Sequence, residues 1–378
     1  MTDAAMADAE DRAARWLRAW DSQGIHRMAT AGDQAGADWL AGVAAALGAR
    51  SAFEPVPVDR YDPVEAYLDI GGDRIDGVAV FDAPSTDGVS GLLGADIAVE
   101  SLHPRVVYSQ GWRDLRTRPG LRGLVVVCSG EAPGLGLLNA EQYRAPYGPP
   151  ALHIDSAHGP RVLAAAAVGA PARIVARARF VRAEARNVVV RLPGRDPSLP
   201  PLVVMTPRSS WWESTSERGG GIVCWLETLR ALLASPPARD VVLTANTGHE
   251  LGHIGLDAFQ AARLLWDRPG GAGWIHYGAN IGAAGGRLSI VSPDEPWRAG
   301  LAAALAESGR PADELAPPTL VPSGETRDIH RAGGLYATLV GDNRLFHLPQ
   351  DRWPHAVDVP AIARIARGAA RFALARAG

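Results

Sequence analysis

The strongest constraint on the fold is the regular alternation of apolar runs and helical patterns after Pro200. The short apolar runs cover residues 201–206, 239–247, 274–282, 287–292 and 335–341. Helical patterns lie among and after them, at residues 219–235, 256–267, 297–309 and 359–377. Near-continuous apolar strands that alternate with helices are typical of a sheet covered on both faces. We therefore predict an α/β domain with a mostly parallel mixed sheet flanked by helices.

The first half of the chain has a different sequence pattern. Residues from about 8 to 49 have a helical pattern, whereas short β-prone runs broken by Gly, Pro and Asp begin at about Val64. These runs include DGVAVFD, RVVYSQ, GLVVVCSG, ALHID and ARIVARARF, with one helical stretch, GPRVLAAAAVGA, among them. The simplest organisation is a discontinuous α/β domain of residues 1–62 and 183–378, with a β-rich insert at 63–182.

Composition narrows the function. The 378 residues carry a net charge of −3, so no electrostatic attraction to nucleic acid or membranes is expected. The chain contains no lysine, which excludes Schiff-base chemistry on a lysine side chain. Cys128 and Cys224 lie in apolar runs, as buried small hydrophobic residues do. We find no secretory signal and no apolar segment long enough to span a bilayer, and so expect a cytoplasmic protein.

The stretch HELGH, from His249 to His253, matches the H-E-x-x-H pattern of zinc proteases. In those enzymes both histidines lie on one face of a helix. Here the motif directly follows the β-prone run 239–247, which predicts a strand-to-helix junction at the carboxyl edge of the sheet. Ligands bind at that edge in open α/β sheets. We therefore favour a site at the sheet edge over a zinc-protease helix.

The order of motifs resembles the co-catalytic zinc aminopeptidase family, which also includes glutamate carboxypeptidases and glutaminyl cyclases. The resemblance is carried by SERGGGI, by TGHELGHIGLDAF and above all by FHLPQDRWPHAVD near the C-terminus. It covers nearly the whole chain. It implies a zinc-exopeptidase fold and, from GPPALHIDSAHGPRVLAAAAVGA, a protease-associated domain as the insert.

The resemblance also implies which ligands survive. Two ligand positions of the family's first metal fall on Arg208 and Ala279, which cannot replace them. Those of the second metal fall on Glu217, Glu250 and His347, so the expected cofactor is one zinc ion. The family's general base falls on His249.

The implied activity is hydrolysis of an amide bond in a small or peptide-like substrate. His249, together with Glu250, is expected to handle the proton, and Arg208 to hold a substrate anion. The substrate pocket is expected to include Trp211, Trp212, Asn280 and Glu325. His253 is expected to line this pocket rather than to bind metal.

Several alternatives remain open. Metal-free acid–base chemistry could use His249, Glu250 and Arg208, and a non-catalytic binding protein could retain the same fold. Glu250 could instead be a buried structural carboxylate paired with Arg208 or Arg218. The two tryptophans could pack under the insert, and His276 is expected to be structural. Association into homo-oligomers also stays open.

Overall fold

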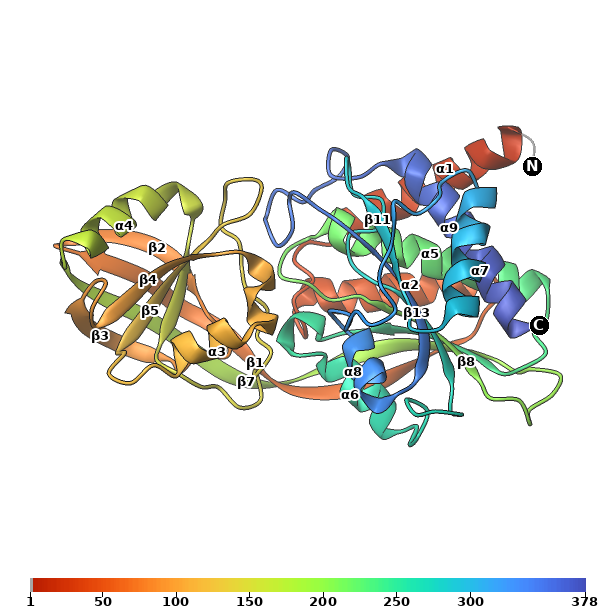
Figure 1. Ribbon diagram of the computed structural model, residues 1–378, viewed down its shortest axis with the longest axis horizontal. Coiled ribbons are helices and arrows are strands. Elements are labelled where there is room, and N and C mark those ends of the chain that lie inside the picture. The colour runs from red at the N-terminus through yellow and green to blue at the C-terminus, as the bar shows by residue number, and fades with distance from the viewer. Residues whose placement is uncertain (1–2) are drawn as a thin grey trace.

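The computed structural model describes residues 3–378 and shows two lobes (Figure 1). The larger lobe holds both ends of the described chain, and the smaller lobe is formed by the middle of the first half. The helices of the larger lobe are α1 (Asp3–Asp21), α2 (Ala31–Ala46), α5 (Thr215–Ala234), α6 (Ile254–Ala261), α7 (Glu295–Glu307), α8 (Thr326–Ala332) and α9 (Val359–Ala377).

The sheet of the larger lobe is mixed, with a parallel centre. Its strands are β8 (Leu202–Pro207), β9 (Val241–Asn246), β10 (Gly273–Tyr277), β11 (Leu288–Val291), β12 (Glu314–Leu315) and β13 (Leu335–Gly341). Their order is β12-β11-β13-β10-β8-β9. The pairs β9–β8, β8–β10 and β10–β13 are parallel, whereas β11 runs antiparallel to β13. The predicted mostly parallel α/β sheet is therefore confirmed.

Helices cover both faces of this sheet, as the apolar strand patterns predict. A large core joins the strands to α1, α2, α5, α7 and α9 on one face. On the other face, Leu256 and Phe259 of α6 and Ile329 of α8 pack on Val203 and Trp274. The predicted helix at 256–267 is wrong at its C-terminal end, because α6 ends at Ala261 and the chain continues in turns.

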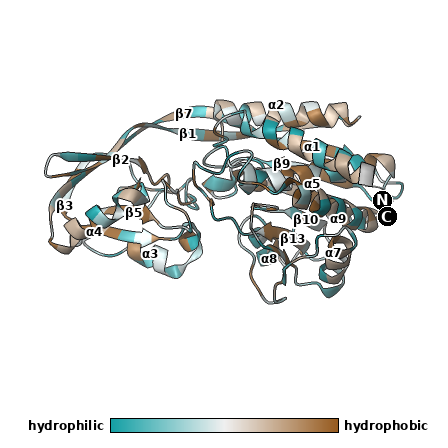
Figure 2. Ribbon diagram, turned by 90° about the horizontal axis from the view of Figure 1, so that it is seen from above, coloured by the Kyte–Doolittle hydropathy of each residue, from teal (hydrophilic) through white to brown (hydrophobic). Residues whose placement is uncertain are grey.

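Two long strands join the lobes. They are β1 (Ser51–Ile70) and β7 (Pro171–Leu192), which pair antiparallel from Ser51↔Val190 to Ile70↔Ala172 (Figure 2). β7 also pairs with β9, so the sheet of the larger lobe continues into the smaller one. The predicted insert boundaries at 62/63 and 182/183 lie inside these strands, near a register shift between Pro63 and Glu65.

The smaller lobe contains the remaining strands and two helices. Its elements are β2 (Asp73–Ala79), β3 (Thr86–Leu92), β4 (Ile97–Leu102), α3 (Gln110–Arg116), β5 (Gly123–Cys128), β6 (Ala151–Ile154) and α4 (Gly159–Ala167). The predicted strand RVVYSQ is wrong, because residues 104–108 form a 3-10 turn whose first residues are capped by the His103 side chain. In the part of the chain that is described, no helix is long and apolar enough to cross a membrane.

Candidate active site

The candidate residues lie where parallel strands end. Arg208 follows β8, His249 follows β9 and Asn280 follows β10. Side chains that follow neighbouring parallel strands reach the same edge of the sheet, which is the usual ligand edge of such folds. Glu325 and His347 come to this edge from the segments around α8 and before α9.

The HELGH stretch is not a helix. β9 ends at Asn246, a 3-10 turn covers His249–Leu251, and α6 begins only at Ile254. Gly252 and His253 both have left-handed backbone conformations, with φ of 79° and 63°, so the chain reverses between the two histidines. Their rings nevertheless lie 5.1 Å apart between centroids. The predicted strand-to-helix junction is confirmed, and the two histidines are neighbours without sharing a helical face.

Glu217 and His347 come together at the start of α5. His347 Nε2 lies 3.3 Å from Glu217 Oε1, and His347 Nδ1 donates to the Leu137 carbonyl at 2.6 Å. Leu137 belongs to the smaller lobe, so both lobes shape this part of the site. Asp351 holds the beginning of α5 by accepting hydrogen bonds from the backbone N–H groups of Ser216 at 2.7 Å and Glu217 at 3.0 Å.

Arg218 adds a positive charge to the same place. Its Nη2 lies 2.8 Å from Glu217 Oε1, and its Nε donates to the Ser209 carbonyl at 2.7 Å. Both side chains are buried. Burial would raise the pKa of Glu217, but the charges of Arg218 and His347 lower it to about 2. Glu217 is therefore an ionised carboxylate whose counter-ion comes from the chain itself.

Two glycines let α5 approach the strand ends this closely. A Cβ at Gly220 would lie 1.8 Å from the Ile281 carbonyl oxygen, and one at Gly221 would lie 2.6 Å from Thr206 Oγ1. No larger residue fits there without a backbone shift. The run GGG following Arg218 thus explains how Glu217 and Arg218 reach the strand ends.

Glu250 does not join Glu217 and His347. Its Oε1 accepts from the Met28 backbone N–H at 2.7 Å and its Oε2 from the Ser209 hydroxyl at 2.5 Å. The same Ser209 hydroxyl accepts from the His249 backbone N–H at 3.1 Å. Burial raises the pKa of Glu250. The structure therefore places Glu250 in a buried network behind the site, where it fixes the backbone that presents His249.

Both terminal nitrogens of Arg208 are also engaged elsewhere. Its Nη1 lies 2.8 Å from Asp33 Oδ1 and donates to the Asp33 carbonyl, and its Nη2 donates to the Arg186 carbonyl at 2.8 Å. Neither Arg208 nor Asp33 has an exposed side chain. The guanidinium predicted to hold a substrate anion thus ties α2 to the sheet.

The surroundings of the two histidines of HELGH shift their pKa values in opposite directions. Burial, together with the charges of Arg218 and the neighbouring histidines, lowers the pKa of His249 well below its ordinary value. Burial also opposes protonation of His253, but its hydrogen bond to Asp328 and the charge of Glu141 raise its pKa. His253 Nδ1 lies 2.9 Å from Asp328 Oδ2. His249 Nδ1 and His253 Nε2 are buried without a hydrogen-bond partner.

His276 and Glu325 extend this group. His276 Nε2 lies 3.6 Å from Glu325 Oε2, and no further partner satisfies either side chain. A Cβ on Gly324 would lie 3.5 Å from His249 Cε1, so the segment before α8 lies directly beside His249. The Asn280 backbone N–H donates to the Glu217 carbonyl at 2.9 Å, while its side-chain oxygen is buried and unpaired. His276 was expected to be structural and instead lies with the candidate residues.

The two tryptophans have structural contacts. Trp211 donates to Asn139 Oδ1 at 3.1 Å and packs on Phe81 of the smaller lobe, with ring centroids 4.8 Å apart. Trp212 donates to the His347 carbonyl at 2.9 Å. Trp211 therefore packs under the insert, and Trp212 holds the segment that carries His347. Both tryptophans also line a cavity of about 490 Å³, so their role in a substrate pocket stays a prediction.

A cavity of about 790 Å³ lies beside this group, between the lobes. The smaller lobe contributes Tyr108 and Glu141 to its wall, and the segment around α8 contributes Ser323 and Arg327. Arg327 bridges the lobes through a 2.7 Å ion pair with Glu141. The volume suits a small ligand.

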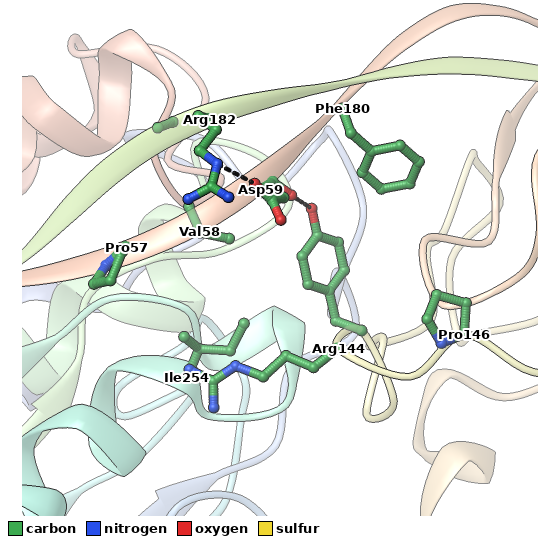
Figure 3. Close-up of a pocket in the computed structure, with 10 residues that line it drawn as sticks. Pro57, Val58, Asp59, Arg144, Pro146, Phe180, Arg182 and Ile254 are labelled. Carbon is green, nitrogen blue, oxygen red and sulfur yellow. Dashed lines mark hydrogen bonds and ion pairs between the residues drawn. The ribbon is translucent and has the colours of Figure 1, made fainter.

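A second cavity, of about 470 Å³, lies against β1 and β7 (Figure 3). In its wall, Arg182 Nε lies 3.8 Å from Asp59 Oδ1, and Arg144 and Ile254 line the opposite side. Among its lining residues, Ile254 is next in sequence to His253 and none belongs to the candidate group. The same holds for the larger cavity, in whose lining Ser323 is next in sequence to Gly324, the residue beside His249.

The described residues do not fit the zinc ion that the resemblance implies. Of the three expected ligands, only Glu217 and His347 meet, and the Arg218 guanidinium lies on the same carboxylate oxygen. Both oxygens of Glu250 already accept hydrogen bonds. Across residues 3–378, no three His, Cys, Asp or Glu side chains are arranged to hold a metal ion.

Comparison with solved structures identifies the fold. A zinc aminopeptidase from Bacillus subtilis superposes with a TM-score of 0.76 at 16% identity, over 96% of this chain and 94% of that one. A peptidase M28 precursor from Shewanella amazonensis superposes with a TM-score of 0.72 at 16% identity, over 99% of this chain and 96% of that one. An aminopeptidase from Aneurinibacillus superposes with a TM-score of 0.70 at 15% identity, over 97% of this chain and 93% of that one. No family model and no curated protein matches the sequence. The chain thus has the zinc-exopeptidase fold of these aminopeptidases over nearly its whole length.

Proposed function

We propose that this chain is a hydrolase of amide bonds in a small or peptide-like substrate, and that His249 and His253 carry out its proton transfers. The observation that carries the proposal is this histidine pair: the two buried rings lie 5.1 Å apart between centroids, their pKa values are shifted in opposite directions, and each has a ring nitrogen without a hydrogen-bond partner. Pairs whose surroundings drive their pKa values apart are typical of acid–base catalysis. The solved structures of the same fold are described as aminopeptidases and a peptidase, which supports an amide substrate.

In the proposed reaction His249 acts as the general base. Its lowered pKa keeps the imidazole neutral at pH 7, so one ring nitrogen has a lone pair. His249 takes a proton from a water molecule as the water oxygen bonds to the substrate carbonyl carbon. The Glu250–Ser209 network positions the His249 backbone.

His253 acts as the general acid. Asp328 orients its ring and favours the protonated form. His253 Nε2 gives its proton to the amide nitrogen as the C–N bond breaks, which releases an amine and a carboxylic acid. His249 then passes its proton through water to His253, so both side chains return to their starting protonation states.

Zinc has no step in this proposal, because the Arg218 guanidinium already pairs with Glu217 and both oxygens of Glu250 already accept hydrogen bonds. When bound in this fold, zinc would polarise the carbonyl and the attacking water. The metal-free alternative is therefore the form of the hydrolase that we propose. The cytoplasmic location, the protease-associated nature of the insert and the absence of nucleic-acid and membrane partners remain proposals alongside it.

The test is a set of aminoacyl and acyl amide substrates assayed with the wild-type protein and with the His249→Ala and His253→Ala variants. General acid–base groups contribute about 10²- to 10⁴-fold to rate, so each variant should lose at least about 100-fold in kcat/KM. The Arg118→Ala variant, at an exposed position on the smaller lobe, is the matched control. Wild-type turnover that survives in His249→Ala would refute the assignment. Substrate binding without turnover by the wild type would identify a non-catalytic binding protein.

A further inference from the structure

We propose that the Arg218 guanidinium takes the place of the metal ion in this site and stabilises the negative charge that develops on the substrate carbonyl oxygen. The inference rests on the proposed hydrolase function and adds the electrophilic partner that this function needs. It also explains why Glu217 and His347 remain together after the metal site has been lost.

The first support is the position of the charge. Arg218 Nη2 and His347 Nε2 both face Glu217 Oε1, at 2.8 and 3.3 Å. That oxygen is the one a metal shared by Glu217 and His347 would bind. A buried cation already lies against it, and placing a second, divalent cation beside Arg218 would cost strong Coulomb repulsion at low dielectric. The chain therefore supplies its own positive charge at this point.

The second support is what Arg218 leaves unpaired. Its Nε is held by the Ser209 carbonyl, yet Nη1 is buried and has no hydrogen-bond partner. A buried donor without a hydrogen-bond partner costs stability, so its presence in a folded protein calls for an explanation, and binding of a ligand is one. Arg208 differs, because both of its terminal nitrogens donate to protein oxygens. Arg218 thus has terminal donors that no hydrogen-bond acceptor satisfies, whereas the unpaired nitrogen of Arg208 is its Nε.

The third support is what surrounds the guanidinium. Its Nε donates to the Ser209 carbonyl at 2.7 Å, and the Ser209 hydroxyl accepts from the His249 backbone N–H at 3.1 Å. Burial raises the pKa of the Tyr108 hydroxyl, and Arg218 is among the charges that oppose this rise. Tyr108 lines the 790 Å³ cavity. Ser209 thus connects Arg218 to the proposed base, and Tyr108, which the Arg218 charge reaches, lies in the wall of the cavity.

These contacts define the chemical step. As the water oxygen bonds to the carbonyl carbon, the carbonyl electron pair moves to oxygen, and the Arg218 N–H groups donate to that oxyanion. When the C–N bond breaks, the electron pair returns to form the carboxyl group. Fixed donors aimed at an oxyanion contribute about 10²- to 10³-fold to kcat. No oxidant, reductant or further co-reactant is needed.

The first experiment measures zinc binding and needs no turnover. Wild-type protein, Arg218→Ala and the double variant Arg218→Ala/His347→Ala are titrated with zinc, and bound metal and Tm are measured. We expect the wild type to bind no zinc at this site. Arg218→Ala, in which only Glu217 and His347 are available as ligands, should bind zinc weakly and gain Tm when zinc is added, and the double variant should lose both effects. One zinc per wild-type chain that disappears in Glu217→Gln would overturn the inference, whatever the variants do.

The second experiment is chemical rescue. Arg218→Ala should lose about 10²- to 10³-fold in kcat/KM. Millimolar guanidinium should restore part of the activity of Arg218→Ala but none of that of His249→Ala, whereas imidazole should do the reverse. Wild-type kcat/KM in Arg218→Ala would contradict the inference. If the wild type hydrolyses no amide while zinc binding follows the expected pattern, the proposed function fails and the placement of Arg218 stands.

Discussion

Replacement of Arg208 by methionine tests whether this arginine is structural. Arg208 and Asp33 form an ion pair with no exposed side-chain surface, and the guanidinium also donates to the Asp33 and Arg186 carbonyls. In Arg208→Met the Asp33 carboxylate keeps its bonds from the Ala29 N–H and the Thr247 hydroxyl but loses its counter-ion. Breaking a buried pair by removing one partner costs about 3–5 kcal/mol. We therefore expect a loss of about 4 kcal/mol, which is roughly a thousandfold in the folding equilibrium.

The assay is urea unfolding of the wild type, Arg208→Met, Asp33→Asn and the double variant. The double variant should be more stable than the sum of the single losses implies, because no unpaired charge remains, with a coupling of about 0.5–3 kcal/mol. The exposed Arg118→Ala substitution should change stability by no more than about 0.5 kcal/mol. The reasoning is refuted if Arg208→Met is as stable as the wild type. If that variant instead raises KM by a large factor at unchanged stability, Arg208 holds a substrate anion after all.

Two further predictions concern the surroundings of the site. Asp328→Asn should cost less stability at pH 9 than at pH 6: the raised pKa of His253 means that its contribution is complete below its ordinary pKa of about 6.5 and is lost as pH rises through the folded-state value. Urea unfolding at both pH values checks this, and an equal or larger cost at pH 9 would contradict it. Gly220→Ala should destabilise by about 1–3 kcal/mol or more because of the Ile281 carbonyl, whereas Gly42→Ala, in α2 with open space around it, should stabilise by about 0.5–1 kcal/mol. Thermal unfolding of the pair checks the signs, and a stable Gly220→Ala would show that α5 does not press on that carbonyl.

The sequence predicts the sheet and its helices well because each element buries a local pattern. The same approach fails for β1, since Pro55, Pro57 and Pro63 interrupt the strand pattern. They are accommodated because β1 pairs only with β7 there, while β2 pairs with it only at Tyr67–Ile70. No local signal announces that one strand runs through both lobes.

The contacts of the site are likewise only partly predictable from the sequence. The proximity of Glu217 and His347 is predictable, because it follows from the order of motifs along the fold. The placement of Glu250 is not, because its partner Met28 is more than 200 residues away in sequence. Arg218 is equally hard to foresee, since an arginine in the first turn of a helix is more often exposed. Only the glycines after it hint that this helix start is buried.

We propose that this fold hydrolyses amides here without a metal. The most direct measurement is kcat/KM of wild-type protein whose zinc content has been quantified, before and after chelator treatment and after zinc is added back. The contacts of Glu217, Arg218 and Glu250 predict less than 0.1 zinc per chain, roughly, at this site and an unchanged kcat/KM in all three states. Activity that falls with the chelator and returns with stoichiometric zinc would contradict the account.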